Sequence, residues 1–408
     1  MAPENLLAVL KVQEVVAVAV INLTQNHRLQ ALQLILCLVL FIGLNVFNNS
    51  QATVLDPDRA DVLYHNYQGG GMKIDGPAIL LRKKATESVA ISAYYYVDMI
   101  SSASVDVMST ASPYSEKRNE AQLGIEYLRD KTLMSMNVRQ SDESDYLAKS
   151  ISINISQDTF GDLTNLSLGL SFGDDQVMRN GDDNFNEQSK HYQLRVGINQ
   201  IVTANLTANL SIEAIADQGY LNNPYRTVRY IDNTLPAGVG YQVEVYPKTR
   251  NSFTSKFSLN YYLPYRAALF LNYRYFSDSW DINSGDIELG YRHPINKSLE
   301  LEFKLRYYQQ SQANFYNDLF PYQDAQNFLA RDKELSDFND FTIGAGVTYT
   351  LPAKFSFGDW RSEASLQWDY IDFNYNNFRD PTAKGGVGNE PFYGFTANVV
   401  RMFFSLYF

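Results

Sequence analysis

The sequence predicts an all-β protein, a transmembrane up-and-down antiparallel β-barrel of about 16 strands. Three observations predict this fold. Apolar and polar residues alternate along most of the chain after Ser88. The alternating segments are about 10 residues long, which is the length of a tilted membrane-spanning strand. The connections between them are alternately tight and long, as in the barrels of bacterial outer membranes.

The alternation is regular enough to assign each side chain to a face. In residues 299–308 one face carries Leu299, Leu301, Phe303, Leu305 and Tyr307, and the other carries Glu300, Glu302, Lys304, Arg306 and Tyr308. Segments that begin at Val89, Ile151, Leu166, Tyr192 and Phe341 repeat this pattern. The alternative is a secreted β-sandwich or β-helix. Its strands would be shorter, about 5 to 6 residues, and its outer faces less uniformly apolar.

The connections are of two kinds. Tight connections occur at 129–131, 159–162, 263–266 and 293–296. Long, acidic connections occur at 99–118, 173–188, 218–250, 309–340 and 379–390. Short periplasmic turns on one rim and long extracellular loops on the other are typical of outer-membrane barrels. Within 218–250, the segments 226–231 and 241–246 have strand patterns, which predict a hairpin that projects outward.

Parity constrains the number of strands. A barrel whose two ends both lie in the periplasm has an even number. About 14 segments fit between residues 88 and 408, and 61–68 with 77–84 add one pair around Gly69, Gly70 and Gly71. We therefore expect about 16 strands. If there are about 14, residues 53–86 form a periplasmic arm or a plug. Residues 53–76 are thus an arm or the first strand, and residues 77–408 are the barrel.

Residues 1–52 resemble an N-terminal extension followed by a signal peptide. The apolar run 32–44 is too short for a membrane-spanning helix, which needs about 20 residues. Ser50 and Ala52 have the spacing that signal peptidase recognises, so we expect cleavage after Ala52. An uncleaved membrane anchor is the alternative. Residues 1–26 lie upstream of a normal signal and are consistent with an over-extended start codon.

The last segment of the sequence is also typical of an exported barrel. One face of this segment carries Val400, Met402, Phe404, Leu406 and Phe408. Such a strand needs no polar tail if both its edges are paired and its apolar face touches lipid. Phe404, Leu406 and Phe408 resemble the signal that the barrel-assembly machinery reads. We therefore expect that machinery, outer-membrane lipid and lipopolysaccharide as partners, and the outer membrane as the location.

Composition and motifs argue against several functions. A net charge of −11 disfavours a nucleic-acid partner, because phosphate binding needs a basic face. The single cysteine, Cys37, lies in the expected signal peptide, so the mature chain would hold no disulfide or thiolate metal site. The sequence has no phosphate-binding loop and no zinc-protease motif. We expect no cofactor, no metal and no enzymatic activity. His191, near an acidic loop, is the one candidate for a rim hydrolase.

The face opposite the lipid is polar and carries both signs of charge. The candidates for lining the lumen are Arg195, Lys256, Arg274, Glu288, Arg292, Glu300, Glu302, Lys304, Arg306, Asp369 and Arg401. One interpretation is structural, with opposite charges on adjacent strands neutralising one another. The other is functional, with a charged, water-filled pore that selects its solutes. A barrel of about 16 strands is wide enough for an aqueous channel.

Several stretches resemble a bacterial family of unknown function that is predicted to form outer-membrane barrels. They are YHNYQGGGMKIDGP (64–77), YYYVDMISSASVDV (94–107), TASPYSEKR (110–118), SQDTFGDLT (156–164) and LNNPYR (221–226). The resemblance extends from about Arg59 to Phe408. It implies the barrel fold but no substrate and no catalytic residue. The family's association with thioredoxin-like and flavin-transfer proteins suggests a periplasmic redox system.

Three functions are compatible with the sequence. The first is a channel or transport pore for an unidentified solute. The second is a barrel scaffold that docks a periplasmic or lipoprotein partner, including a redox carrier, through residues 53–77. The third is a hydrolase at the rim that uses His191.

Overall fold

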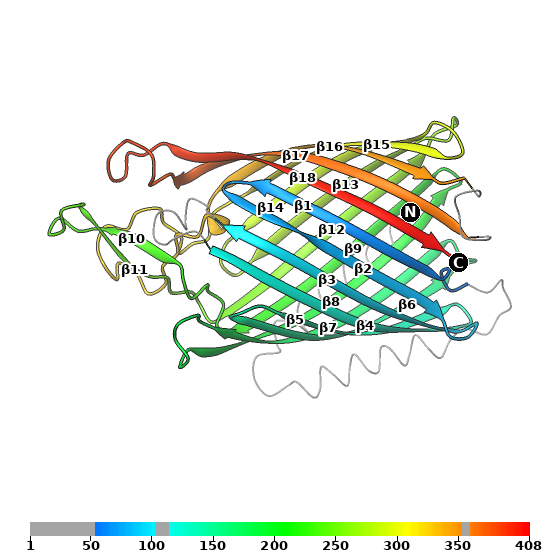
Figure 1. Ribbon diagram of the computed structural model, residues 1–408, viewed down its shortest axis with the longest axis horizontal. Coiled ribbons are helices and arrows are strands. Elements are labelled where there is room, and N and C mark those ends of the chain that lie inside the picture. The colour runs from blue at the N-terminus through cyan, green and yellow to red at the C-terminus, as the bar shows by residue number, and fades with distance from the viewer. Residues whose placement is uncertain (1–53, 103–113, 353–359) are drawn as a thin grey trace, which may run out of the picture. The chain divides into compact units, whose positions relative to one another are not determined.

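The described part of the chain folds into a closed barrel of sixteen antiparallel strands (Figure 1). The computed structural model describes residues 54–102, 114–352 and 360–408. Within these ranges the wall strands are β1 (Arg59–Gly69), β2 (Met72–Lys84), β3 (Val89–Ser102), β4 (Tyr114–Arg129), β5 (Thr132–Asp142), β6 (Tyr146–Thr159), β7 (Thr164–Met178), β8 (Asn186–Thr203), β9 (Leu206–Gly219), β12 (Thr249–Tyr262), β13 (Ala268–Asp278), β14 (Asn283–Pro294), β15 (Leu299–Gln310), β16 (Phe338–Thr350), β17 (Arg361–Arg379) and β18 (Phe392–Tyr407). No helix in the same ranges is long and apolar enough to cross a bilayer.

The first and last wall strands close the sheet. β18 pairs with β1, so that Arg59 lies opposite Tyr407 and Gly69 lies opposite Ala397. The expected even number is confirmed, and it is sixteen rather than fourteen. Residues 59–69 are a wall strand and not an arm, so the wall begins before the expected position 77. The features expected of a signal peptide in residues 1–52 lie outside the described residues.

The two rims differ in the length of their connections, as the sequence predicts. Short turns join the strands at one rim: 85–88, 130–131, 160–163, 204–205, 263–267 and 295–298. The other rim carries 179–185, 220–248, 311–337 and 380–391, together with the short turns 70–71, 143–145 and 279–282 (Figure 1). Residues 103–113, in the connection between β3 and β4, lie outside the described residues. Gly70 and Gly71 have positive φ angles of 57° and 77°, which a two-residue hairpin turn requires.

The outward face of the wall is an apolar belt. Large exposed side chains on this face include Leu123, Ile125, Met136, Val138, Ile151, Ile153, Leu289, Phe303, Leu305, Ile343 and Leu366. Aromatic residues with the same orientation include Tyr261, Tyr273, Tyr275, Tyr307, Tyr349 and Trp368. So much contiguous apolar surface is unfavourable in water. It matches the lipid-facing band of a membrane barrel, with aromatic residues suited to its interfaces.

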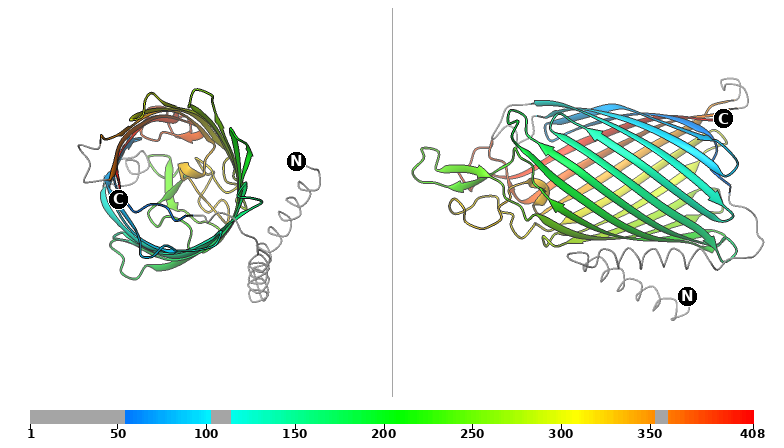
Figure 2. Two further views of the ribbon diagram at one scale, coloured as in Figure 1. Left: turned by 90° about the vertical axis from the view of Figure 1, so that its right-hand side faces the viewer. Right: turned by 90° about the horizontal axis from the view of Figure 1, so that it is seen from below.

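Three long connections form one folded unit at the long-loop rim, which we call the cap: residues 220–248, 311–337 and 380–391. Two short strands in it, β10 (Thr227–Ile231) and β11 (Val239–Val243), pair as the predicted hairpin. The second strand begins and ends slightly earlier than expected. The cap also holds the 3-10 turn η1 (Lys333–Leu335). From the short-turn end the cap is seen across the opening of the ring, and from the side it lies at the far end of the strands (Figure 2).

A hydrophobic core holds the cap to the inner wall. Its buried residues are Tyr246, Trp280, Ile282, Ala313, Phe315, Tyr316, Ala330, Leu335, Tyr375 and Phe378. Aromatic side chains of four wall strands pack against this core: Phe276 of β13, Phe338 of β16, Phe373 of β17, and Tyr393 and Phe395 of β18. Phe373 and Phe395 stack with their ring centroids 4.6 Å apart. The cap is therefore packed against one side of the mouth, formed by β13 and β16–β18.

Candidate functional site: the inner wall and the cap

All eleven residues expected to line the lumen alternate with the apolar belt and so face inward. They are Arg195 on β8, Lys256 on β12, Arg274 on β13, Glu288 and Arg292 on β14, Glu300, Glu302, Lys304 and Arg306 on β15, Asp369 on β17 and Arg401 on β18. Their neighbours along each strand, such as Leu289, Phe303 and Leu305, are large, apolar and exposed on the other face.

Most of these charges are paired with a carboxylate on a neighbouring strand. Arg274 Nε lies 2.7 Å from Asp286 Oδ2, and Arg306 Nη1 lies 3.3 Å from Asp340 Oδ1. Arg306 also lies 3.5 Å from Asp286 through its Nε atom, so the pairs form a ladder over β13–β16. Because the partners are held by the register of the sheet, their charges neutralise one another locally.

A second group of pairs lies on β14–β18. Lys304 Nζ lies 3.0 Å from Asp369 Oδ1, and Arg401 forms an ion pair with the same carboxylate. Arg292 contacts Glu302 at 2.6 Å and Glu300 at 3.3 Å. On the far side of the barrel, Arg195 Nη2 lies 2.7 Å from Glu213 Oε2 of β9.

Two of the expected residues behave differently. Glu288 accepts a hydrogen bond of 3.0 Å from the amide of Asn272 instead of pairing with a cation. Lys256 lies opposite Arg274 on β13 and Ser211 on β9. Within the described ranges no ion pair or hydrogen bond is recorded for its ammonium group. Lys256 is therefore an inward cation that keeps its charge open to the lumen.

The structure also shows a charged group on β1–β5 that sequence reasoning did not bring together. Asp98 Oδ1 accepts hydrogen bonds from Tyr96 at 2.6 Å and His65 at 2.7 Å, and the Tyr96 and His65 rings stack at 5.0 Å. Arg118 lies 3.3 Å from Glu120. Alternation along each strand places each of these side chains on the inward face. Only the register of the strands shows which of them meet.

The inward charges are not packed into a solid interior. The side chains of Arg195, Arg274 and Arg292 are 53%, 46% and 49% exposed, although they lie inside a closed wall. The structure therefore leaves open space beside these side chains. By contrast, the carboxylate side chain of Asp369, which holds two cations, is only 9% exposed.

The hydrolase candidate His191 has no ring nitrogen free for catalysis. Its Nδ1 lies 2.8 Å from Asp217 Oδ1, and its Nε2 lies 2.9 Å from Asp175 Oδ2. Two carboxylates bonded to both nitrogens favour a doubly protonated imidazolium, which cannot accept a proton. Tyr146 donates a further hydrogen bond to Asp175. In the described part of the chain, no three His, Cys, Asp or Glu side chains are grouped to hold a metal.

A buried ion cluster joins the three connections of the cap. Arg229 of β10 lies 2.5 Å from Asp318 and 2.6 Å from Glu390, and its own side chain is almost fully buried. Arg331 contacts the same Asp318 at 3.0 Å. At a second attachment, the Tyr225 hydroxyl lies 2.5 Å from Asp145 Oδ2, in the turn between β5 and β6. Arg229 thus links residues from all three connections.

A buried carboxyl group lies beside this ion cluster. Glu244 accepts hydrogen bonds from the backbone N–H of Arg331 at 2.7 Å and from the Tyr246 hydroxyl at 2.7 Å. Burial, together with the nearby charge of Asp332, raises the pKa of Glu244 to about 7. Burial also raises the pKa of Asp332, although Arg226 forms an ion pair with it.

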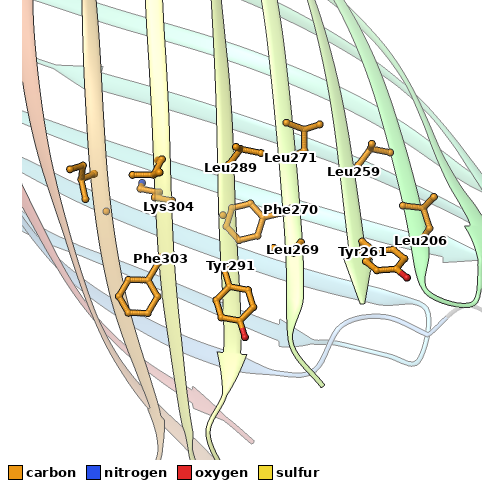
Figure 3. A pocket seen from close by; sticks show the side chains of 14 residues that line it. Leu206, Leu259, Tyr261, Leu269, Phe270, Leu271, Leu289, Tyr291, Phe303 and Lys304 are labelled. Atoms are coloured by element: carbon orange, nitrogen blue, oxygen red, sulfur yellow. The ribbon is translucent and has the colours of Figure 1, made fainter. Parts of the chain in front are cut away.

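The outward face has a broad apolar depression, of about 690 Å³ (Figure 3). Leu259, Leu271 and Leu289 line it on neighbouring strands, and Tyr261 and Tyr291 lie closer to the short-turn rim. The ring of Phe270, which faces inward, covers Gly290 here, because a Cβ added to Gly290 would lie 1.8 Å from that ring. Its lining is apolar except for Lys304 and belongs mostly to the belt, so it lacks the polar groups of a solute site.

The sequence profile of one protein family, described as Protein of unknown function (DUF3570), matches residues 104–188 and 178–405. The chain belongs to this family. The matched stretches contain the strands from β4 to β17, most of β18 and the whole cap. The family resemblance expected from the sequence is therefore confirmed. A comparison with curated proteins finds no significant match.

Solved structures with similar architecture are outer-membrane proteins of low sequence identity. The siderophore receptor PirA from Acinetobacter baumannii is 9% identical with a TM-score of 0.43, over 87% of this chain and 60% of that one. OmpT of Vibrio cholerae is 10% identical with a TM-score of 0.41, over 88% of this chain and 99% of that one. CdiB from Acinetobacter baumannii is 8% identical with a TM-score of 0.47, over 86% of this chain and 60% of that one. This chain thus spans 60% of the length of PirA and of CdiB. At these TM-scores the likeness carries no functional argument.

Proposed function

We propose that the chain is an integral outer-membrane channel that passes small water-soluble molecules, a porin-like function in a Gram-negative envelope. The observation that carries the proposal is the exposure of Arg195, Arg274 and Arg292 inside a closed wall. Side chains that filled the lumen would bury these groups. Their exposure supports a water-filled interior, as expected for a barrel of about 16 strands.

The outer surface supports a membrane location. The wall leaves no unpaired strand edge, because β1 and β18 pair along the full length of β1. A closed sheet with an apolar exterior satisfies its backbone hydrogen bonds internally, which a hydrocarbon environment requires. We further propose lipopolysaccharide and the barrel-assembly machinery as partners. Phe404, Leu406 and Phe408 would form the assembly signal, and Phe404 and Phe408 are exposed on the outward face.

Conductance in a planar lipid bilayer tests the channel. The purified, refolded protein should give stepwise current increases in potassium chloride, and heat-denatured protein from the same preparation should give none. Protein that is folded by its heat-dependent shift in gel mobility, yet never gives a step, would contradict the channel.

Docking of a periplasmic or lipoprotein partner, including a redox carrier, is a separate proposal. β1 is enclosed between β2 and β18, so a free docking segment has to lie before Arg59. Co-purification of a partner that is lost on deleting residues 53–58 would support it.

We also propose that the chain is not an enzyme. The carboxylates on both ring nitrogens of His191 support this, because they leave this histidine unable to act as a general base. An activity abolished by His191→Ala in a folded barrel would contradict it.

A further inference from the structure

The inward faces of β5, β6 and β7 form an uncharged polar surface, which we call the hydroxyl strip. It consists of Ser135, Asn137, Ser150, Ser152, Asn154, Ser156, Ser167 and Ser171, with Gly169 and Gly173 between them. The register places them side by side: Asn137 lies opposite Ser152, which lies opposite Ser171. Ionisable side chains border the strip but do not enter it. Arg139 and Asp175 lie toward the long-loop rim and Asp158 toward the short-turn rim. On β8, Arg195 and His191 lie opposite Gly169 and Gly173.

Several hydroxyl groups of the strip are available to a ligand. Within the described residues, the hydroxyls of Ser150, Ser152 and Ser167 form no hydrogen bond with another group of the chain. All three side chains are half-buried and so remain accessible from the lumen. A hydroxyl group both donates and accepts, and a polar group with access to water is hydrogen-bonded to water when no solute is present.

The opposite side of the lumen has a different chemistry. Seven strands separate β6 from β16 in each direction around the barrel, so these two strands face each other. On the β16 side, Lys304, Asp369 and Arg401 form one ion-paired group. A Cβ added to Gly344 of β16 would lie 2.4 Å from Asp369 Oδ1, so the charged group covers this strand. One side of the lumen thus carries charged side chains that neutralise one another. The other side carries short, uncharged side chains.

We propose that the transported solutes are neutral and rich in hydroxyl groups, such as sugars or polyols, and that they move along the hydroxyl strip. This inference rests on the proposed channel function. A polyol exchanges its hydrogen bonds to water for bonds to serine and asparagine at little cost. An ion loses part of its hydration on the same path. The two cations beside the strip offer it little compensation, because Arg195 is paired with Glu213 and Arg139 with Glu120. The short side chains also leave space for a solute to approach the wall.

Tracer uptake into liposomes tests the solute class. Liposomes containing the full chain take up mannitol, gluconate or glucosamine, which are similar in size but neutral, anionic and cationic. Mannitol should enter fastest. Replacing Ser150, Ser152 and Ser167 together by alanine should lower mannitol uptake about threefold or more, because solute hydrogen bonds are lost. The heat-dependent shift in gel mobility of the same variant should not change, which shows that its barrel is folded.

The matched control is Ser258→Ala on β12, an inward serine outside the strip, which should leave mannitol uptake unchanged. Uptake of gluconate or glucosamine as fast as mannitol, with normal conductance, overturns the solute class while the channel stands. If the triple variant does not fold, the uptake rates of the three solutes are compared in the wild-type chain and in Ser152→Ala. The proposal requires that mannitol enters the wild-type liposomes fastest and that Ser152→Ala slows it. Absence of both conductance and uptake overturns the channel itself.

Discussion

At the scale of single residues, pairing decides what an inward charge can do. Arg274 is held by a carboxylate on the neighbouring strand and Lys304 by one two strands away, so their fields are largely cancelled a short distance away. Lys256 faces the same lumen without such a partner in the described ranges. The same reasoning applies in the cap, where the buried Arg229 compensates the charges of Asp318 and Glu390.

Lys256→Glu should make the channel more selective for cations. The substitution replaces an uncompensated positive charge by a negative one at the lumen surface, and we expect the anion-to-cation permeability ratio to fall about twofold or more. The reversal potential across a potassium chloride gradient measures this ratio. Lys384→Glu makes the same change of charge at an exposed position of the cap and should have a smaller effect. Equal effects would show that Lys256 has no special place in the current path.

Arg229→Ala should loosen the cap. The substitution leaves the carboxylates of Asp318 and Glu390 without their shared cation, and breaking such a buried pair costs about 3–5 kcal/mol. Hydrogen exchange in residues 311–337 should become faster, while exchange in β5–β7 should not change. Lys384→Ala, an exposed cation in the same cap, is the control. Unchanged protection of the cap in Arg229→Ala would be evidence against the ion cluster.

The stability of the cap should depend on pH through Glu244. The pKa of this carboxyl group rises from an ordinary value of 4.5 to about 7 in the folded cap, so the folded cap binds the proton more tightly than the unfolded cap. The stabilisation is complete below pH 4.5, is lost as the pH rises through about 7, and amounts to about 3 kcal/mol at most.

Hydrogen exchange of residues 220–248, corrected for the intrinsic effect of pH, should therefore be slower at pH 5.5 than at pH 8. Glu244→Gln should remove most of this difference. The difference that remains should be due to Asp332, whose pKa is raised as well. A cap equally protected at both pH values would contradict the role of Glu244.

At the scale of elements, the two faces of each strand differ in polarity. On β15, Phe303 and Leu305 lie on the apolar belt, while Lys304 and Arg306 form ion pairs within the lumen. The period of a strand is two, so a shift of the register by one residue would place charges on the apolar belt and leucines in the lumen. This cost fixes the register of all the long wall strands.

Leu305→Arg should destabilise the barrel, because it places a cation on the lipid face. The expected cost is about 2–4 kcal/mol near the middle of the bilayer. Thr254→Arg is the matched control, since Thr254 faces inward and lies opposite Glu213 on β9. Urea unfolding of both variants in lipid vesicles measures the difference. Equal costs for the two substitutions would contradict the assigned faces.

At the scale of the whole molecule, the structure consists of a closed wall and a cap packed against one side of its mouth. The wall supplies the lumen, and the cap covers part of its mouth from the side of β13 and β16–β18. The cap shares its main hydrophobic core with the wall, but it has a small buried cluster of its own, Val228, Phe320 and Leu329, and its own ion cluster.

Deletion of the hairpin residues 227–243, with a short glycine and serine linker in their place, should increase the single-channel conductance. The deletion removes Arg229 and part of the material that lies across the mouth. We expect a conductance about 1.5-fold higher or more and fewer closures, since access through the mouth adds to the resistance of the pore. Heat-modifiable gel mobility should stay normal. An unchanged conductance in a folded variant would mean that the cap does not restrict the current.

The wall of this barrel could be predicted from the sequence because its determinants are local. Alternation along one strand assigns each residue to a face, so the inward position of residues such as Glu302 and Arg306 followed without knowledge of the neighbouring strands. The hairpin in the cap was predicted for the same reason. The first strand was left open, because 59–69 has a weaker apolar face, with Asn66 and Gln68 on it.

Tertiary structure alone decided which residues meet. The ion pairs, the hydroxyl strip and the position of the cap depend on strand register and on contacts such as that of Arg229 with Glu390, which are far apart in the sequence. Alternation gives the face of a side chain but not its neighbour on the next strand, and it gives no signal for a core built from loops. The sequence therefore determined the barrel and the two faces of its wall. The pairing of charges within the lumen and the cover on its mouth were decided by long-range packing.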